Sequence, residues 1–208
     1  MIANHRRLSG RTMAIKFLFF LMVTCFTPLA MSMEEIERDP REFFFIQSFG
    51  DMPAELQAAR EQGKAGLLLF FEAEGCSYCQ AMLKRVFNQK RVQDWYQQHF
   101  LSIAVDIHGD VEITDFDNIT LPSKVFADHR KVFLTPVVSF IDLDGTEIYR
   151  HAGMVTSPDE FLVIGEYITG KHYFDKEFKV FAGQHGMQTT SKSLTTSFQN
   201  SAKTGADK

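Results

Sequence analysis

The stretch FEAEGCSYCQAML, from Phe71 to Leu83, places two cysteines three residues apart, where an apolar run gives way to an amphipathic one. The run before them, GLLLFFEA (residues 66–73), is typical of a strand buried on both faces of a sheet. After them, apolar residues recur at the spacing of one helical face: Cys79, Met82, Leu83, Val86 and Phe87. The stretch therefore predicts a strand-to-helix junction with Cys76 at the start of the helix.

This placement gives the two cysteines different chemistry. At a helix N-terminus, unpaired backbone N–H groups and the macrodipole favour a negative charge. Cysteines in such positions commonly have pKa values of about 3.5–7.5, against about 8.5 for a free thiol. Cys79 lies one turn further on, on the face expected to pack inward, where a shielded thiol can attack a mixed disulfide. The positions predict Cys76 as the nucleophile and Cys79 as the resolving cysteine.

The cysteine pair has two other possible roles, a structural clip and a metal site. A disulfide that closes so short a loop removes little chain entropy, so a structural clip would stabilise the fold poorly. Zinc and copper sites usually take two to four soft ligands, and the chain has no second cysteine pair. Four of its histidines, His99, His108, His129 and His151, could add ligands, but none has the spacing of a metal site. We favour redox chemistry with no cofactor beyond a Cys76–Cys79 disulfide; a copper or zinc carrier is the alternative.

Residues 1–32 have the pattern of a cleavable secretory signal. Basic residues precede an apolar stretch, Phe17 to Met31, that is too short for a comfortable membrane span. The segment holds four basic residues and no acidic one, so its removal moves the formal charge from −4 to −8. That balance argues against nucleic acid as a partner. An uncleaved membrane anchor is the alternative for this segment.

The remaining chain divides into three parts. Residues 33–50 read as an acidic linker, and residues 51–182 carry the strand and helix patterns of one α/β domain. A second strand at residues 101–106 implies a parallel crossover from the first. Residues 183–208 are polar, rich in Ser and Thr, and expected to be disordered.

A second informative pair is Thr135-Pro136, directly before the apolar strand VVSFID. Proline at this position removes a ladder donor and often marks a cis peptide bond. A cis bond would turn the Thr135 carbonyl and N–H outward, free to pair with another chain. An ordinary trans proline at a strand start is the alternative.

In this order and spacing, the elements resemble the thioredoxin fold over about residues 50–175: a central mixed β-sheet flanked by helices, with the C-x-x-C pair at a helix N-terminus. Within that superfamily the chain looks most like the SoxW-type periplasmic thioredoxins, and the matching stretches are CSYC, DFDN, TPVVSFIDLDGTEIYRHAG and GKHYFDKEF. The resemblance implies dithiol–disulfide exchange, with Cys76 attacking, Cys79 resolving and Pro136 in cis beside them.

The chain departs from cytosolic thioredoxins at several places. Where those proteins carry Trp before the first cysteine and Gly-Pro between the pair, this chain has Gly75 and Ser77-Tyr78. Phe70 stands at the position of their buried Asp. Glu72, two residues further on, is expected on the opposite face of the strand. If Glu72 nonetheless lies close to the sulfurs, it could relay the proton of Cys79; a solvated strand end is the other interpretation.

The direction of exchange follows from the resemblance alone. Ser77, Tyr78 and Thr135 look more like periplasmic disulfide reductases and isomerases than like general thioredoxins. Isomerases of that type dimerise through a separate N-terminal domain, and residues 33–50 are too short to form one. The resemblance therefore implies a monomeric periplasmic reductase of protein disulfides, kept reduced by a membrane-embedded electron donor. A more oxidising disulfide oxidase or isomerase is the alternative.

Overall fold

The computed structural model describes residues 36–187. The signal-peptide prediction for residues 1–32 lies outside the described residues. So does the prediction of disorder for residues 183–208, except at residues 183–187, where α8 continues to Gln184. Within residues 36–187, no helix is both long enough and apolar enough to cross a membrane.

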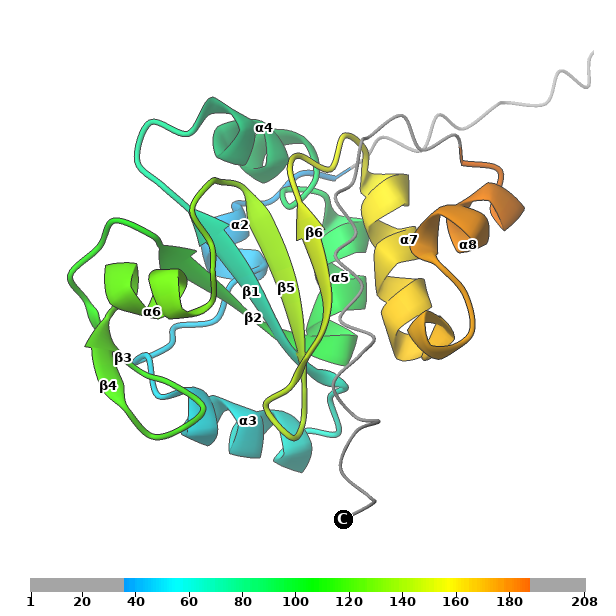
Figure 1. Cartoon of the computed structure of the whole chain (residues 1–208). Helices are drawn as coiled ribbons and strands as arrows, with labels where there is room; N and C mark the ends of the chain where they lie inside the picture. The colour runs from blue at the N-terminus through cyan, green and yellow to red at the C-terminus, as the bar shows by residue number, and fades with distance from the viewer. Residues whose placement is uncertain (1–35, 188–208) are drawn as a thin grey trace, which may run out of the picture. The chain divides into compact units, whose positions relative to one another are not determined.

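A four-stranded mixed sheet forms the centre of the domain (Figure 1). Its strands run in the order β2-β1-β5-β6, and their bounds are β1 Gly66–Glu72, β2 Phe100–Asp106, β5 Val137–Asp142 and β6 Glu147–Ala152. β1 pairs in parallel with β2 and antiparallel with β5, and β5 pairs antiparallel with β6. The parallel crossover and the mixed sheet agree with the sequence analysis.

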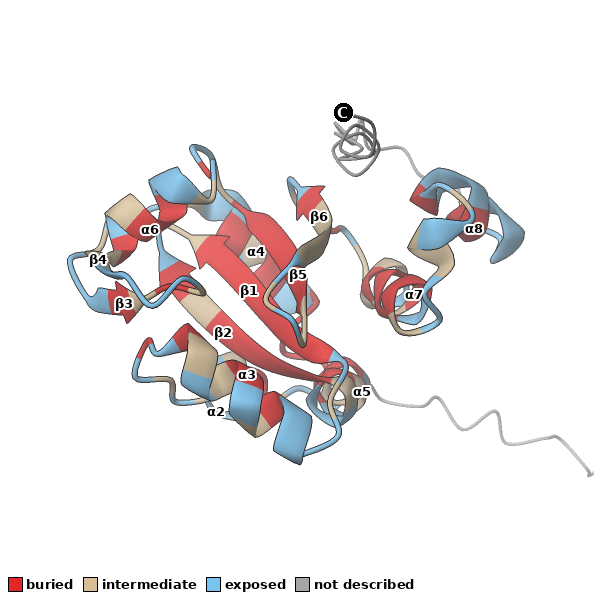
Figure 2. Cartoon of the chain, turned by 60° about the horizontal axis from the view of Figure 1, so that its bottom comes forward, coloured by how far each residue is buried: buried red, intermediate tan, exposed pale blue. Residues whose placement is uncertain are grey.

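Both faces of β1 are buried, as the unbroken apolar run predicted. Successive side chains of a strand point to opposite faces. Leu68 and Phe70 therefore join one hydrophobic cluster, whereas Leu67, Leu69 and Phe71 join another on the far side of the sheet. Figure 2 shows the buried strands between helices whose outer faces are exposed.

Different helices cover the two faces. The Phe70 face packs against α4 (Ser77–Arg85), α5 (Lys90–His99), α7 (Pro158–Thr169) and α8 (Phe178–Gln184). The opposite face packs against α3 (Met52–Glu61) and α6 (Ser123–His129). A small hairpin of β3 (Glu112–Thr114) and β4 (Thr120–Pro122) precedes α6.

Stacked aromatic rings hold much of the Phe70 face together. The rings of Tyr96 on α5 and Phe161 on α7 stack with centroids 4.2 Å apart, and the Tyr96 hydroxyl donates to the Phe161 carbonyl at 2.6 Å. Phe44 stacks on Phe87 with centroids 4.5 Å apart. Such pairs add to the free energy gained from burial alone.

The segment that the sequence analysis assigned to a linker contributes to this core. Asp39 caps α2 (Pro40–Phe43), and its side chain accepts a hydrogen bond from the Arg41 N–H at 2.8 Å. Phe44 and Phe45, which follow directly, are only 2% and 7% exposed. Ordered, buried structure therefore begins before the predicted domain start at residue 51.

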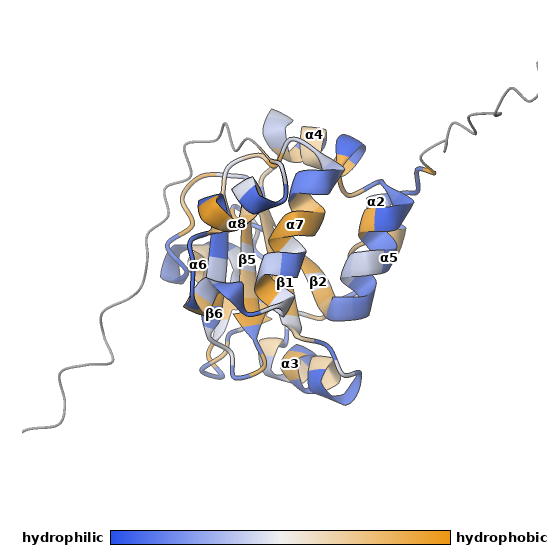
Figure 3. Ribbon diagram, turned by 90° about the vertical axis from the view of Figure 1, so that its right-hand side faces the viewer, coloured by the Kyte–Doolittle hydropathy of each residue, from blue (hydrophilic) through white to orange (hydrophobic). Residues whose placement is uncertain are grey.

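α7 begins at a capping residue, Ser157. The Ser157 hydroxyl accepts from the Glu160 N–H at 3.1 Å, and the Glu160 carboxylate accepts in return from the N–H of Thr156. Polar and apolar residues alternate around this helix (Figure 3), and its apolar side faces the sheet. After the short helix η1 (His172–Phe174), α8 returns Phe178 and Phe181 to the same cluster.

Candidate active site

Cys76 and Cys79 form a disulfide at the start of α4, with their Sγ atoms 2.08 Å apart. Cys76 is the N-cap residue of the helix, and its Sγ accepts a hydrogen bond from the Cys79 N–H at 3.1 Å. The pair therefore lies at the strand-to-helix junction that the sequence predicted. The helix N-terminus presents N–H groups to the Cys76 sulfur, an arrangement that stabilises a thiolate once the disulfide is reduced.

Glycine shapes the turn that leads into the helix. Gly75 has a φ of +74°, in the left-handed region that favours glycine. The Cys76 N–H then donates to the Ala73 carbonyl at 3.2 Å, which closes the turn. No acidic residue lies in the first turn of α4 to oppose a negative charge on Cys76.

The two sulfurs differ in exposure. Cys79 is 0% exposed and belongs to the same cluster as Phe70, whereas Cys76 is half-buried at its edge. Ser77 and Tyr78, between them, are both exposed. Cys76 is thus the cysteine of the pair that a disulfide of another molecule can reach, whereas the fully buried Cys79 can react only with Cys76.

Pro136 lies at the same edge of the sheet as the end of β1. The Thr135–Pro136 peptide bond is cis, and the buried Pro136 precedes Val137, which pairs with Phe71 of β1. The Pro136 carbonyl accepts from the Gly153 N–H at 2.9 Å. Register and hydrogen bonding therefore bring Thr135, Pro136 and Gly153 to the end of the sheet from which the cysteine motif departs.

The side chain of Glu72 lies on the Phe70 face, because residues two apart in a strand point the same way. The expectation that it faces the opposite side was therefore wrong. Arg41 of α2 donates to both oxygens of Glu72, from Nη1 at 2.6 Å and from Nη2 at 2.7 Å. This hydrogen bonding raises the pKa of the Arg41 guanidinium. With a side chain only 13% exposed, Glu72 is held in an ion pair and is not a solvated strand end.

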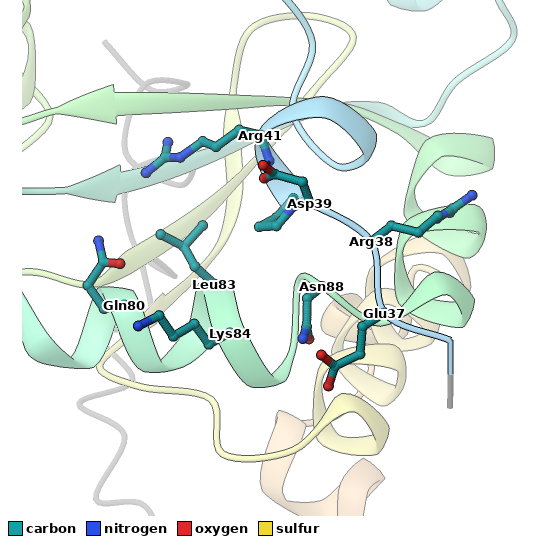
Figure 4. A pocket seen from close by; sticks show the side chains of 9 residues that line it. Glu37, Arg38, Asp39, Arg41, Gln80, Leu83, Lys84 and Asn88 are labelled. Atoms are coloured by element: carbon teal, nitrogen blue, oxygen red, sulfur yellow. Dashed lines mark hydrogen bonds between the residues drawn. The ribbon is translucent and has the colours of Figure 1, made fainter. Parts of the chain in front are cut away.

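A pocket of about 670 Å³ opens between α4 and the segment that carries Arg41 (Figure 4). Residues 37–41 form one wall, and Gln80, Leu83 and Lys84 of α4 form the other. No local sequence pattern predicts this pocket, because its two walls are about 40 residues apart in the chain.

In the sequence, His151 stands out only as one of four histidines that could add a metal ligand. Within residues 36–187, no group of three or more His, Cys, Asp or Glu side chains is arranged to hold a metal ion. His151 is instead buried in β6, and burial lowers the pKa of its imidazole. The alternation of EIYRHA, with Tyr149 two residues earlier, was the one signal that could have placed it inward.

Comparison with known proteins gives one family. A family model described as a thioredoxin-like domain matches residues 52–169. None of the curated proteins matches the chain closely enough to count as a relative.

Among solved structures, a thioredoxin-fold protein from Helicobacter pylori is similar, with a TM-score of 0.54 and 24% identity over 71% of this chain and 94% of that one. The reduced C-terminal domain of Neisseria meningitidis DsbD has a TM-score of 0.41 and 19% identity, over 56% of this chain and 90% of that one. A thioredoxin from Thermus thermophilus has a TM-score of 0.43 and 22% identity, over 65% and 93%. The first of these similarities shows the shared fold.

Proposed function

Because this chain belongs to the thioredoxin-like domain family, we propose that it is a periplasmic thiol–disulfide oxidoreductase that reduces disulfide bonds of protein clients. The observation that carries the proposal is the Cys76–Cys79 disulfide at the N-terminus of α4, with Cys76 half-buried and Cys79 fully buried. Exchange needs this asymmetry, because the accessible sulfur meets the client and the buried one completes the reaction.

The proposed reaction has two displacements. The reduced protein presents a Cys76 thiolate, which attacks one sulfur of the client disulfide; the other client sulfur leaves with the electron pair of the broken bond. The Cys79 thiolate then attacks Cys76, which forms the Cys76–Cys79 disulfide and releases the first client sulfur. Two electrons pass to the client, and the protein ends in the oxidised state seen here.

The surroundings of Cys76 support a protein client. Tyr78 is 61% exposed, and Phe133 and Leu134, directly before Thr135, are 66% and 82% exposed. Apolar side chains beside a reactive sulfur suit a segment of unfolded or extended polypeptide. In the proposal the backbone of Thr135 pairs with that segment, and Pro136 and Ser77 shape the contact.

Location and direction rest on sequence. The signal-like segment 1–32 supports export, and the resemblance to SoxW-type thioredoxins supports a monomer in the periplasm. A reductase there needs electrons from the cytoplasmic side, so a membrane-embedded donor completes the cycle. The proposal includes no cofactor other than the cysteine pair.

Reduction of insulin by dithiothreitol, followed as precipitation of the freed chains, tests this function. The protein should accelerate the reaction, whereas Cys76→Ser should not, because the attacking sulfur is gone. Absence of acceleration by the native protein, together with uptake of one copper or zinc ion by the pair, would favour a metal carrier instead.

A further inference from the structure

His151 is a buried histidine without a partner. Its side chain is 3% exposed, and neither Nδ1 nor Nε2 finds a hydrogen-bond partner within residues 36–187. Buried polar groups are bonded in the large majority of cases, so an exception of this kind calls for an explanation. The place of His151 in the sheet supplies one.

The register of the sheet puts His151 on the same side as the buried cysteine. His151 pairs with Val138 of β5, and Val138 pairs with Phe70 of β1. Directly paired residues of antiparallel strands point to the same face. Val138 and Phe70 belong to the hydrophobic cluster that contains Cys79, so the imidazole faces that cluster too. Two residues beyond His151, the Gly153 N–H donates a hydrogen bond to the Pro136 carbonyl.

Few charged or titratable groups face this imidazole. α7 contributes Glu160, whose carboxylate accepts from the N–H and hydroxyl of Thr156 and opposes the effect of burial on the pKa of His151. β6 itself contributes Tyr149, whose phenol pKa burial raises far above its ordinary value. The neighbouring strand β5 contributes only apolar residues to this cluster, Val138 and Phe140, and α4 contributes Cys79 with Met82 and Leu83.

The chemistry of exchange needs a proton acceptor in this cluster. Cys79 must lose its proton before it can attack, and with 0% exposure it has no direct access to water. The end of β1 supplies no free acceptor on this face, because Phe70 is apolar and both oxygens of Glu72 accept from Arg41. Among the residues from 36 to 187 that are classed as buried, the only carboxylate or imidazole besides His151 is Asp115, whose Oδ1 accepts from the N–H groups of Asp117 and Ile119.

We propose that His151 accepts the proton of Cys79 when this thiol attacks the mixed disulfide at Cys76, an inference that rests on the proposed exchange function. The proton moves from Cys79 Sγ to an imidazole nitrogen, and the Cys76–Cys79 bond forms as the bond from Cys76 to the client breaks. The client sulfur leaves as a thiolate and takes a proton from solvent or from the imidazolium. Burial keeps the imidazole neutral near neutral pH, because it lowers its pKa.

Single-turnover release of thionitrobenzoate separates the two cysteine steps. The fully reduced protein is mixed with less than one equivalent of dithiobis-nitrobenzoate: Cys76 releases the first thionitrobenzoate, and attack by Cys79 releases the second. For His151→Gln we expect the second phase to slow by at least about 100-fold near neutral pH, in the range of a lost general base. The gap should close well above the ordinary thiol pKa of about 8.5, where Cys79 ionises without help. The first phase should not change.

Ser139→Ala is the matched control. Ser139 is 0% exposed and its hydroxyl has no hydrogen-bond partner among the described residues, but it pairs with Leu69 and so faces the opposite cluster. Its removal should leave both phases unchanged. An unchanged second phase in His151→Gln, or one slowed equally at every pH, would overturn the inference. Release of only one thionitrobenzoate by the native protein would instead contradict the proposed function itself.

A measurement on the native protein covers the case in which His151→Gln fails to fold. The ring protons of His151 are titrated by NMR in the oxidised and in the reduced protein. If His151 accepts the proton of Cys79, the two titrations should differ, because Cys79 carries a proton to exchange only in the reduced form. Identical titration curves in the two states would contradict it.

Discussion

Arg41 and Glu72 form a two-pronged ion pair, with Nη1–Oε1 and Nη2–Oε2 distances of 2.6 and 2.7 Å, that ties α2 to the end of β1. The Arg41 guanidinium also lies 5.6 Å from the centre of the Phe45 ring. α2 precedes residues 52–169, the part matched by the family model. A segment outside the family pattern therefore engages the strand end that carries the cysteine motif.

Breaking this pair should weaken the fold measurably. For Arg41→Met we expect the free energy of unfolding to fall by about 1 kcal/mol, because paired hydrogen bonds to a charge are strong but the arginine is half-exposed to solvent. Urea denaturation of Arg41→Met, Glu72→Gln and the double variant gives the coupling. Lys124→Met, which removes a more exposed pair with Asp110, should change stability by less than about 0.5 kcal/mol. Strictly additive losses in the double variant would contradict a direct contribution of the pair.

The two cysteine substitutions should fail differently. Cys76→Ser should lose all turnover, because Cys79 is fully buried and cannot meet a client. Cys79→Ser should keep the attacking thiolate and accumulate a mixed disulfide through Cys76. Non-reducing electrophoresis followed by mass spectrometry of the adduct checks both. An adduct recovered in equal amount from Cys76→Ser would reverse the assigned roles.

His151 should make the fold sensitive to acid. Burial, partly offset by Glu160, holds its pKa below the ordinary value of about 6.5, so the unfolded chain binds the proton more readily than the folded one. Its contribution is fully present above about pH 6.5 and is lost as the pH falls toward the lowered folded pKa, by at most about 1.4 kcal/mol per pH unit. The free energy of unfolding of His151→Leu, measured against pH, should lack this slope. Parallel pH profiles for the two proteins would show that His151 does not titrate as described.

The same substitution should have opposite effects in two helices. A Cβ at Gly165 of α7 would lie 2.2 Å from Cζ3 of Trp95, so Gly165→Ala must displace the ring and should cost about 1–3 kcal/mol. A Cβ at Gly183 of α8 meets nothing within 4 Å, and Gly183→Ala should stabilise by up to about 1 kcal/mol. Thermal unfolding of the two variants tests the α5–α7 contact. A neutral Gly165→Ala would mean that the Trp95 ring is not fixed there.

Features with a strong local pattern could be predicted from sequence. The apolar run of β1 and the helical spacing after Cys76 both formed the predicted elements. Each of these signals depends on residues within a few positions of one another, so distant contacts are not needed to predict the element.

Features that depend on distant partners were missed or misplaced. α2 is four residues long, too short for a periodic signal, and the burial of Phe44 depends on Phe87 and Phe161. The contact of Glu72 depends on Arg41, 31 residues earlier. The orientation of Glu72 was a different kind of error, because the alternation of a strand already placed it on the same side as Phe70.

The proposed direction of electron flow, from the protein to its client, depends on the equilibrium reduction potential of the Cys76–Cys79 couple. The mature protein is equilibrated with a graded glutathione or dithiothreitol series, and the fraction of free thiol is measured at each ratio. We expect a potential of about −200 mV or lower, in the range of glutaredoxins and thioredoxins. A potential of about −120 mV, that of a strong disulfide oxidant, would contradict the proposed direction of electron flow.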